Sequence, residues 1–359
     1  MSDPAQQQVE KGQGQKVEQQ HPAGPAQVQA HAVGDQALQL GAVGLGNGFS
    51  PPDQEALGAG GLVLVAGVAA VLVRPWRRAV VAVFAPFAIV LAWWLTLAPS
   101  NQRDWQPDVA RLPTATIDGS MLTVRNVRDF TFRGGEDFTE RWETRTYDLD
   151  TLVGFDMFIS FWGPALYGHT IASWEFADGR HLAVSIETRK EKGEEYSAVR
   201  GFFRQYELYY VVADERDIIA LRTNHLGETL QLYPTNRSAD KSRELLLDYV
   251  EEINAIAEQP RWYNALTQNC TTTIWHHTKA VGSGPPLDWR LLANGYLVDL
   301  AYENGTVNTS IGLDELKRRS DITARARSAG DLDGFSKAIR EGLPPRPPGV
   351  SPATAASAP

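Results

Sequence analysis

The chain of 359 residues contains a single cysteine, Cys270, and this limits the kinds of cross-link that can stabilise the fold. One thiol cannot form an intrachain disulfide, and it cannot supply a multi-thiolate zinc site. The fold must therefore be stabilised by the burial of apolar side chains. About 240 residues remain once the predicted tails and membrane segments are set aside, which is enough for one sizeable domain with a full core.

Cys270 lies where a polar loop turns into a helix. No helix breaker occurs from Thr271 to Ala280, and the Gly- and Pro-rich segment 282–286 ends the helix. This pattern predicts that Cys270 lies in the first helical turn, where unsatisfied N–H groups and the helix dipole favour a thiolate. Such a thiolate is a nucleophile, and we expect the neighbouring N–H groups, with Asn269, to stabilise an oxyanion. The alternative is an inert, buried thiol.

Two uncharged apolar runs precede the domain. Residues 56–73 and 79–99 are each near the length of about 20 residues that a helix needs to cross a membrane. Arg74, Arg77 and Arg78 lie between them. By the positive-inside rule, this arginine loop is expected on the cytoplasmic side, so that everything after residue 100 faces outward. The sequence therefore predicts a two-helix transmembrane hairpin over residues 56–99.

Composition divides the rest of the chain. Residues 1–52 are rich in Gln, Gly and Ala, residues 343–359 are rich in Pro and Ala, and both are predicted to be disordered tails. Residues 100–113 form a polar linker, and residues 114–340 form the predicted catalytic domain. The net charge is −9, and the sequence has no basic block beyond the arginine loop, so no nucleic-acid partner is predicted.

The domain mixes strands and helices. Asp118-Gly119 and Asp178-Gly179 predict hairpin turns, and the second turn joins strands over 169–176 and 181–189. Ser238 is expected to cap an amphipathic helix. The apolar face of that helix is predicted to carry Leu245, Leu246, Tyr249, Val250, Ile253 and Ile256. The predicted fold class is α+β.

A thiol nucleophile needs a base, and five histidines of the domain compete for that role. His276 and His277 follow the cysteine on its own helix at a distance of about 9–10 Å, beyond hydrogen-bond reach, and are expected to be partly exposed. His225 is expected in a turn. His169 and His181 lie at opposite ends of one hairpin. Small residues before His169 leave room for a substrate, so His169 is the predicted base.

Four separated segments resemble the Lnb N-terminal periplasmic domain family. They are 168–170, 185–191, 201–207 and 263–272, and the resemblance covers about residues 100–282 together with the membrane hairpin. It implies a permuted papain-like (NlpC-type) core, in which an antiparallel sheet packs on a cysteine-bearing helix. It also implies a Cys–His acyl-transfer site that faces the periplasm from the bacterial inner membrane. The family's named member acylates lyso-lipoproteins, so phospholipid or lipoprotein is the implied partner.

Carried onto this chain, the resemblance implies Cys270 as the nucleophile and His169 as the base, with a third polar group from the next strand. An unbulged hairpin places residue 169 opposite 187–188, so Glu187 is the predicted third group. Ser185 is the alternative, because a slip of one residue changes the face of the strand. An equally open alternative for Glu187 is a purely structural ion pair with Arg189 or Arg204.

The sequence thus predicts a membrane-anchored cysteine acyltransferase or hydrolase that forms an acyl-cysteine. Two alternatives stay open: an NlpC-like peptidoglycan amidase or endopeptidase, and a non-catalytic, membrane-tethered binding module. A zinc hydrolase is the least favoured class, because no His-Glu-x-x-His motif is present. No cofactor or metal is expected.

Overall fold

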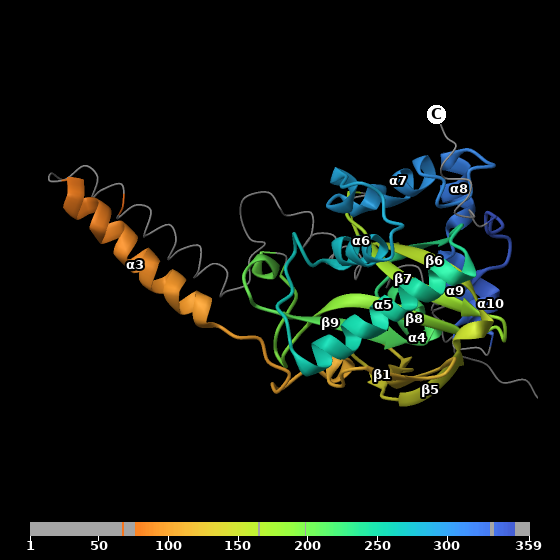
Figure 1. The fold of residues 1–359 in the computed structure, drawn as a ribbon, viewed down its shortest axis with the longest axis horizontal. Helices are drawn as coiled ribbons and strands as arrows, with labels where there is room; N and C mark the ends of the chain where they lie inside the picture. The colour runs from red at the N-terminus through yellow and green to blue at the C-terminus, as the bar shows by residue number, and fades with distance from the viewer. Residues whose placement is uncertain (1–66, 68–75, 164–165, 198, 331–333, 349–359) are drawn as a thin grey trace, which may run out of the picture. The chain divides into compact units, whose positions relative to one another are not determined.

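The computed structural model describes residues 67, 76–163, 166–197, 199–330 and 334–348 (Figure 1). The predicted tail 1–52 lies outside these residues, as does all of the first apolar run except Gly67. The described chain is a mixed α+β structure with an antiparallel-rich sheet, which confirms the predicted fold class at that level.

The strands are β1 (Thr114–Asp118), β2 (Met121–Arg128), β3 (Thr131–Phe132), β4 (Phe138–Thr139), β5 (Trp142–Asp148), β6 (Leu152–Phe161), β7 (His169–Phe176), β8 (His181–Arg189), β9 (Glu207–Ala213) and β10 (Thr229–Pro234). The α-helices are α3 (Trp76–Thr96), α4 (Glu215–Ala220), α5 (Ala239–Glu258), α6 (Cys270–Ala280), α7 (Leu297–Glu303), α8 (Leu313–Ser320), α9 (Thr323–Ala329) and α10 (Phe335–Ile339). Short helical turns are η1 (Pro107–Val109), η2 (Leu149–Thr151), η3 (Arg200–Phe202), the π-helical η4 (Leu221–His225), η5 (Trp289–Leu291) and η6 (Asn294–Tyr296).

The central sheet runs in the order β1-β2-β9-β8-β7-β6-β10, and β5 pairs with β2. The pairings from β9 to β10 are all antiparallel, whereas β2 and β9 meet in parallel. The hairpin of β7 and β8 therefore lies inside the sheet, with a neighbour on each side. Its turn contains Gly179 at φ +83°, a conformation that glycine adopts without strain, and this confirms the predicted Asp-Gly turn.

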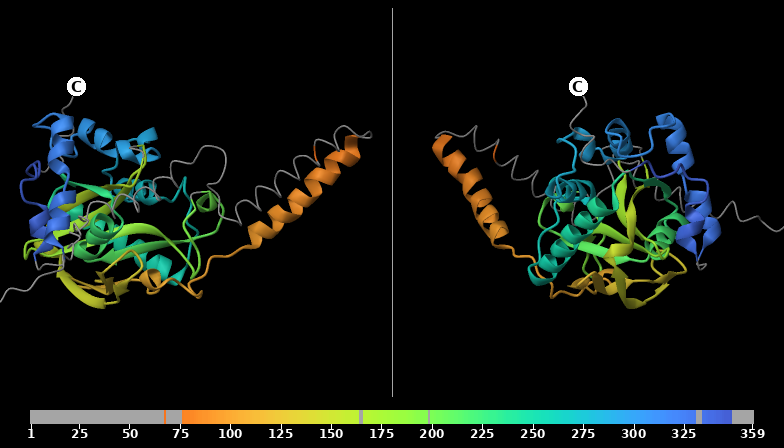
Figure 2. Two further views of the ribbon diagram at one scale, coloured as in Figure 1. Left: turned by 180° about the vertical axis from the view of Figure 1, so that it is seen from behind. Right: turned by 45° about the vertical axis from the view of Figure 1, so that its right-hand side comes forward.

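Two apolar clusters cover the two faces of the sheet (Figures 1 and 2). On one face, α5 and α6 pack against Trp174, Val184 and neighbouring side chains. On the other face, α4, α9 and α10 pack against side chains that include Ile171 and Ala183. A cysteine-bearing helix thus packs directly on the sheet, as predicted.

The amphipathic helix α5 agrees with its sequence pattern. The Ser238 hydroxyl accepts a hydrogen bond from the Lys241 N–H and caps the helix. All six predicted apolar residues are buried: Leu245, Leu246, Tyr249, Val250, Ile253 and Ile256. The helix is therefore stabilised mainly by its apolar face against the sheet.

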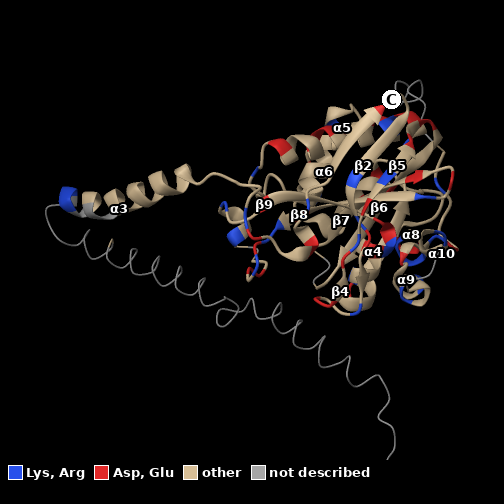
Figure 3. Cartoon of the chain, turned by 90° about the horizontal axis from the view of Figure 1, so that it is seen from below, with Lys and Arg blue, Asp and Glu red and all other residues tan. Residues whose placement is uncertain are grey.

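Most of the second predicted membrane span, residues 79–99, lies in the 21-residue helix α3. Figure 3 shows that α3 carries no charged side chain beyond its first turn, and Phe84, Ile89 and Trp93 are exposed. Among the described residues, however, no helix combines the length and the apolar character that crossing a membrane requires. The predicted transmembrane hairpin is not confirmed.

Part of the predicted C-terminal tail is ordered. Residues 343–348 belong to the described structure, and the Arg346 guanidinium donates to the backbone oxygen of Phe155 at 2.9 Å and to the Asp156 carboxylate at 2.8 Å. The prediction of disorder from the Pro-rich composition of 343–359 is therefore wrong for residues 343–348, because Arg346 binds two buried acceptors. Residues 349–359 lie outside the description.

The core makes a direct stability prediction at Trp174, which is 0% exposed and donates its indole N–H to the Ser242 carbonyl oxygen. Trp174→Ala should lower the free energy of unfolding by about 3–5 kcal/mol, because it leaves a cavity and an unpaired carbonyl. Val153→Ala, at a side chain that is 42% exposed on β6, should change it by no more than about 0.5 kcal/mol. Urea denaturation followed by far-ultraviolet circular dichroism, a signal of the backbone, measures the unfolding free energy of both variants. Equal losses in the two variants would contradict the burial of Trp174.

Candidate active site

Cys270 is the first residue of α6, and one capping residue shapes the loop before it. The Asn269 side-chain oxygen accepts a hydrogen bond from the Thr272 N–H at 2.8 Å, and the Asn269 N–H donates to the Thr272 hydroxyl at 3.0 Å. This reciprocal pair determines where the helix begins. The prediction that the sulfur lies at a helix N-terminus is confirmed.

His169 begins β7 and is 7% exposed. Its Nε2 lies 2.6 Å from Ser185 Oγ and 3.0 Å from Glu187 Oε1. The Ser185 hydroxyl donates to the same carboxylate oxygen at 2.7 Å, so it accepts from the ring. This network assigns the proton of the neutral imidazole to Nε2 and leaves Nδ1 as the nitrogen that can accept a proton. Both predicted third groups therefore contact the histidine.

The strand register explains why Ser185 and Glu187 both contact His169. Ile171 pairs with Ser185 across β7 and β8, so position 169 falls opposite 187, as the sequence predicts. Side chains two residues apart share a face of a strand, and His169, Ser185 and Glu187 therefore point to the same side. The imidazole reaches the hydroxyl on the diagonal and the carboxylate directly across.

Cys270 and His169 are electrostatically coupled, and each shifts the pKa of the other. Burial raises the pKa of the thiol, but the positive charge of His169, together with contacts from the Thr170 N–H and Thr271, brings it below the usual value of 9.0. Burial is the largest single influence on the pKa of His169 and lowers it, but Glu187 and Cys270 together outweigh burial and Arg222, and the pKa rises from 6.5 to about 9. Both shifts favour a thiolate–imidazolium pair.

A buried arginine balances the carboxylate behind the histidine. Arg222 in η4 donates to Glu187 Oε1 at 2.7 Å and to Glu228 Oε2 at 3.1 Å, and Ser160 also donates to Glu228. Burial raises the pKa of Glu187, but His169 and Arg222 together hold it well below its usual range. Glu187 is therefore a carboxylate that faces two cations.

The two arginines that the sequence suggested as ion-pair partners of Glu187 bind elsewhere. Arg189 donates instead to the backbone oxygens of Val109 and Ala110 on another part of the domain. Arg204 donates to backbone oxygens near the end of α3. The arginine that does pair with Glu187 is Arg222, 35 residues further along the chain.

Asn294 links the cysteine helix to the start of β7. Its side-chain nitrogen lies 3.8 Å from Cys270 Sγ and 3.1 Å from Thr271 Oγ1, while its side-chain oxygen accepts from the Gly168 N–H at 2.7 Å. Thr271 Oγ1 also lies 3.1 Å from Thr170 Oγ1. These bonds hold the sulfur against the end of the strand that carries the base.

The predicted oxyanion role of Asn269 has little room in this geometry. Its side-chain oxygen caps α6, and its side-chain nitrogen donates to the Ala265 backbone oxygen at 2.9 Å. The N–H groups of Cys270 and Thr271 are better placed, because the first turn of a helix provides no intrahelical acceptor for them. Asn269 thus shapes the site by starting the helix at Cys270.

The other histidines lie away from the thiol. His276 is exposed, as expected, but the expectation for His277 is wrong. His277 is buried, where Nε2 lies 2.8 Å from the Tyr210 hydroxyl and Nδ1 lies 2.5 Å from Asp248. His181 begins β8 at the far end of the hairpin, and His225 ends η4.

Sequence reasoning missed Arg222 and Asn294. Neither is part of a local motif, and each reaches the site only because the fold brings η4 and η6 to the ends of β7 and β8. The assembled group has a nucleophile, a base and an orienting carboxylate, which is the set that acyl transfer through a covalent intermediate requires. A separate cluster, Asp156, Glu175 and His181, brings potential metal ligands together.

Comparison with known protein families gives a match over part of the chain. A family model described as the Lnb N-terminal periplasmic domain matches residues 138–295, a range that contains His169, Glu187, Cys270 and Asn294. Neither the curated proteins nor the solved structures include a match to the chain. The family confirms the resemblance predicted from the four motifs, whereas the kinship with papain-like enzymes stays a prediction.

The electrostatics predict how the thiol reacts with pH. Iodoacetamide should alkylate Cys270 with a midpoint below pH 9.0, because only the thiolate reacts and its pKa is lowered by His169. In His169→Asn the midpoint should rise, since the thiol keeps the penalty of burial and loses the imidazolium. Stopped alkylation followed by mass spectrometry gives both profiles, and His276→Asn is the matched control. Identical profiles for wild type and His169→Asn would contradict the pairing.

Proposed function

Residues 138–295 belong to the Lnb N-terminal periplasmic domain family, and on this premise we propose that the chain is a periplasm-facing cysteine acyltransferase or hydrolase. One observation carries the proposal. The buried thiol of Cys270 lies at a helix N-terminus, where His169 lowers its pKa, and the His169 imidazole in turn contacts Glu187 at 3.0 Å. That combination of a lowered thiol pKa and an oriented base characterises thiol enzymes.

The first half-reaction forms an acyl-enzyme. The Cys270 thiolate attacks the carbonyl carbon of an ester or amide, and a carbon–sulfur bond forms. The N–H groups of Cys270 and Thr271 stabilise the oxyanion. The His169 imidazolium then gives its proton to the departing alcohol or amine as the bond to that group breaks.

The second half-reaction releases the acyl group. An amine or a water molecule attacks the thioester, and neutral His169 takes its proton. The carbon–sulfur bond breaks, the thiolate is regenerated, and the imidazolium is ready for the next cycle. An amine acceptor makes the reaction an acyl transfer, and water makes it a hydrolysis.

Phospholipid or lipoprotein at the bacterial inner membrane is the proposed substrate class, and an inner-membrane anchor belongs to the same proposal. Two features support it. Helix α3 exposes large apolar side chains, among them Phe84 and Ile89. Arg204 of the domain donates to the Trp94, Leu95 and Leu97 backbone oxygens at 3.1–3.3 Å, which ties the end of α3 to the domain. The packing of α6 on an antiparallel sheet supports the proposed papain-like kinship.

An acyl-enzyme should be detectable on Cys270. Purified full-length chain incubated with phosphatidylethanolamine that carries isotopically labelled acyl chains should gain a thioester adduct, which neutral hydroxylamine removes. His169→Asn should slow adduct formation roughly 10²–10⁴-fold, the usual contribution of a general acid–base. His276→Asn, an exposed histidine on the same helix, should leave the rate unchanged.

The outcomes separate the competing functions. No adduct from any lipid, together with released peptides from isolated peptidoglycan sacculi, would favour a peptidoglycan amidase or endopeptidase. No adduct and no product from either substrate, with an unreactive thiol, would leave a binding module. Cys270→Ala must abolish the adduct in all cases, or the assignment of the nucleophile is wrong.

Glu187 and Ser185 should affect the pH profile differently. Glu187 is the strongest of the contacts that raise the pKa of His169 to about 9, so the imidazolium persists up to about that pH. In Glu187→Gln that pKa should fall, and the alkaline limb of the rate of acyl-enzyme formation should shift to lower pH. Ser185→Ala keeps the carboxylate, so its alkaline limb should stay in place while the rate falls. Pre-steady-state rates from pH 5 to 10 measure this, and a shift in Ser185→Ala alone would reverse the two roles.

A further inference from the structure

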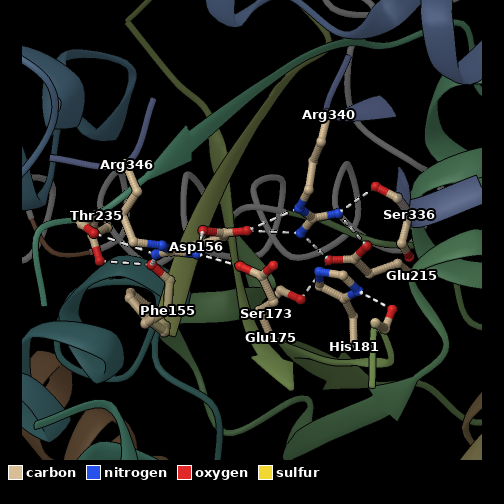
Figure 4. Close-up of polar contacts among 11 residues, drawn as sticks. Phe155, Asp156, Ser173, Glu175, His181, Glu215, Thr235, Ser336, Arg340 and Arg346 are labelled. Carbon is tan, nitrogen blue, oxygen red and sulfur yellow. Dashed lines mark hydrogen bonds and ion pairs between the residues drawn. The ribbon is translucent and has the colours of Figure 1, made fainter. Parts of the chain in front are cut away.

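A second polar cluster lies at the other end of the β7–β8 hairpin (Figure 4). Glu175 and His181 are direct cross-strand partners, and Asp156 lies on the neighbouring strand β6. One ligand atom from each of the three lies within 4.8 Å of the other two. Asp156 is 1% exposed and His181 is 8% exposed. The cluster is therefore built into the sheet.

His181 is oriented as a ligand. Its Nδ1 lies 3.2 Å from the Gly179 carbonyl oxygen, so this nitrogen carries the proton and Nε2 presents a lone pair. Nε2 is buried and has no hydrogen-bond partner among the described residues. A buried nitrogen in that condition is destabilising until something binds it. A backbone acceptor on one ring nitrogen is the usual support of a histidine whose other nitrogen binds a metal.

Two arginines from the C-terminal segment bind the carboxylate of Asp156 and one further carboxylate each (Figure 4). Arg340 donates to Asp156 and to Glu215. Arg346 Nη2 lies 2.8 Å from Asp156 Oδ1 and 2.7 Å from Glu175 Oε2. The Arg346 guanidinium thus bridges two of the three ligand groups, at the place where a cation would be stabilised. Without Arg346, the carboxylates of Asp156, Glu175 and Glu215 and the guanidinium of Arg340 carry a net charge of two negative units. A divalent ion neutralises that charge.

A cavity beside the cluster gives an ion access to it. This cavity of about 210 Å³ reaches two of the three ligand residues, Asp156 and Glu175, and is also lined by both arginines and the prolines of the C-terminal segment. Gly154 makes space for the guanidinium, because a Cβ there would lie 2.6 Å from Arg346 Cζ. The flexible end of the arginine can therefore move without a shift of the sheet.

We propose that Asp156, Glu175 and His181 bind a divalent transition-metal ion in competition with the Arg346 guanidinium. One imidazole nitrogen and two carboxylate oxygens are ligands that zinc and manganese accept. The ion satisfies the His181 nitrogen and displaces Arg346, so the segment 341–348 loosens from the sheet. This site is separate from the Cys270 pair and does not depend on the proposed acyl transfer. It revises the sequence-based expectation of no metal.

Metal titration of the full-length, tag-free chain tests the proposal. After dialysis against EDTA, isothermal titration with Zn²⁺ and with Mn²⁺, and metal analysis after gel filtration, should show one ion per chain for at least one of them. His181→Asn should weaken binding at least about 100-fold, since it removes a ligand. His276→Asn is the matched control and should bind as wild type does. All titrations are repeated in Cys270→Ser, so that the thiol cannot account for the ion.

Two further variants test the competition. Arg346→Gln should strengthen metal binding at least about tenfold, because the competing cation is gone. Gly154→Ala should also strengthen binding, because its methyl group expels the guanidinium while the arginine stays in the chain. Amide hydrogen exchange of residues 341–343 should rise when metal is added to wild type. Absence of binding in both variants, or binding that survives His181→Asn, would overturn the proposal.

Discussion

The pairing register of β7 and β8 is the constraint on which both buried polar clusters depend. Ile171 lies opposite Ser185 and Glu175 lies opposite His181, so one face of this hairpin carries polar groups at each end and apolar groups between them. A slip of one residue would move every one of these side chains to the face that packs on α5 and α6. The Gly179 turn prevents that slip, since its positive φ suits few residues other than glycine.

Proton transfer within the Cys270–His169 pair leaves the net charge of the cluster unchanged, so its neighbours decide where the proton lies. Glu187 touches the ring and favours the imidazolium, while the Thr170 N–H and the start of α6 favour the thiolate. Arg222 keeps the carboxylate charged within the fold. Removing one partner of such a buried pair costs about 3–5 kcal/mol, so the arrangement is held firmly even though burying the charges is itself unfavourable.

Sequence patterns anticipated those parts of the fold that depend on local chemistry. The cap at Ser238, the helix start at Cys270 and the Asp178-Gly179 turn are local signals, and from the turn the register of His169 with Glu187 follows by counting. Arg222 was beyond reach, because its contact with Glu187 depends on how η4 packs on the sheet. The burial of His277 was missed for the same reason: a helical pattern does not reveal that Asp248 and Tyr210 come from two other elements.

The two clusters are joined by one helical segment as well as by the hairpin. Glu215 begins α4 and binds Arg340 and Ser173, whereas Arg222 in η4 binds Glu187. These residues are seven positions apart, which is two helical turns and about 10.5 Å along the axis, so both face the sheet. Four residues of strand, from position 169 to position 173, span about 13 Å. The helical segment therefore nearly matches the length of strand that separates the two clusters, and it connects the ion pair of Glu215 with Arg340 to that of Arg222 with Glu187.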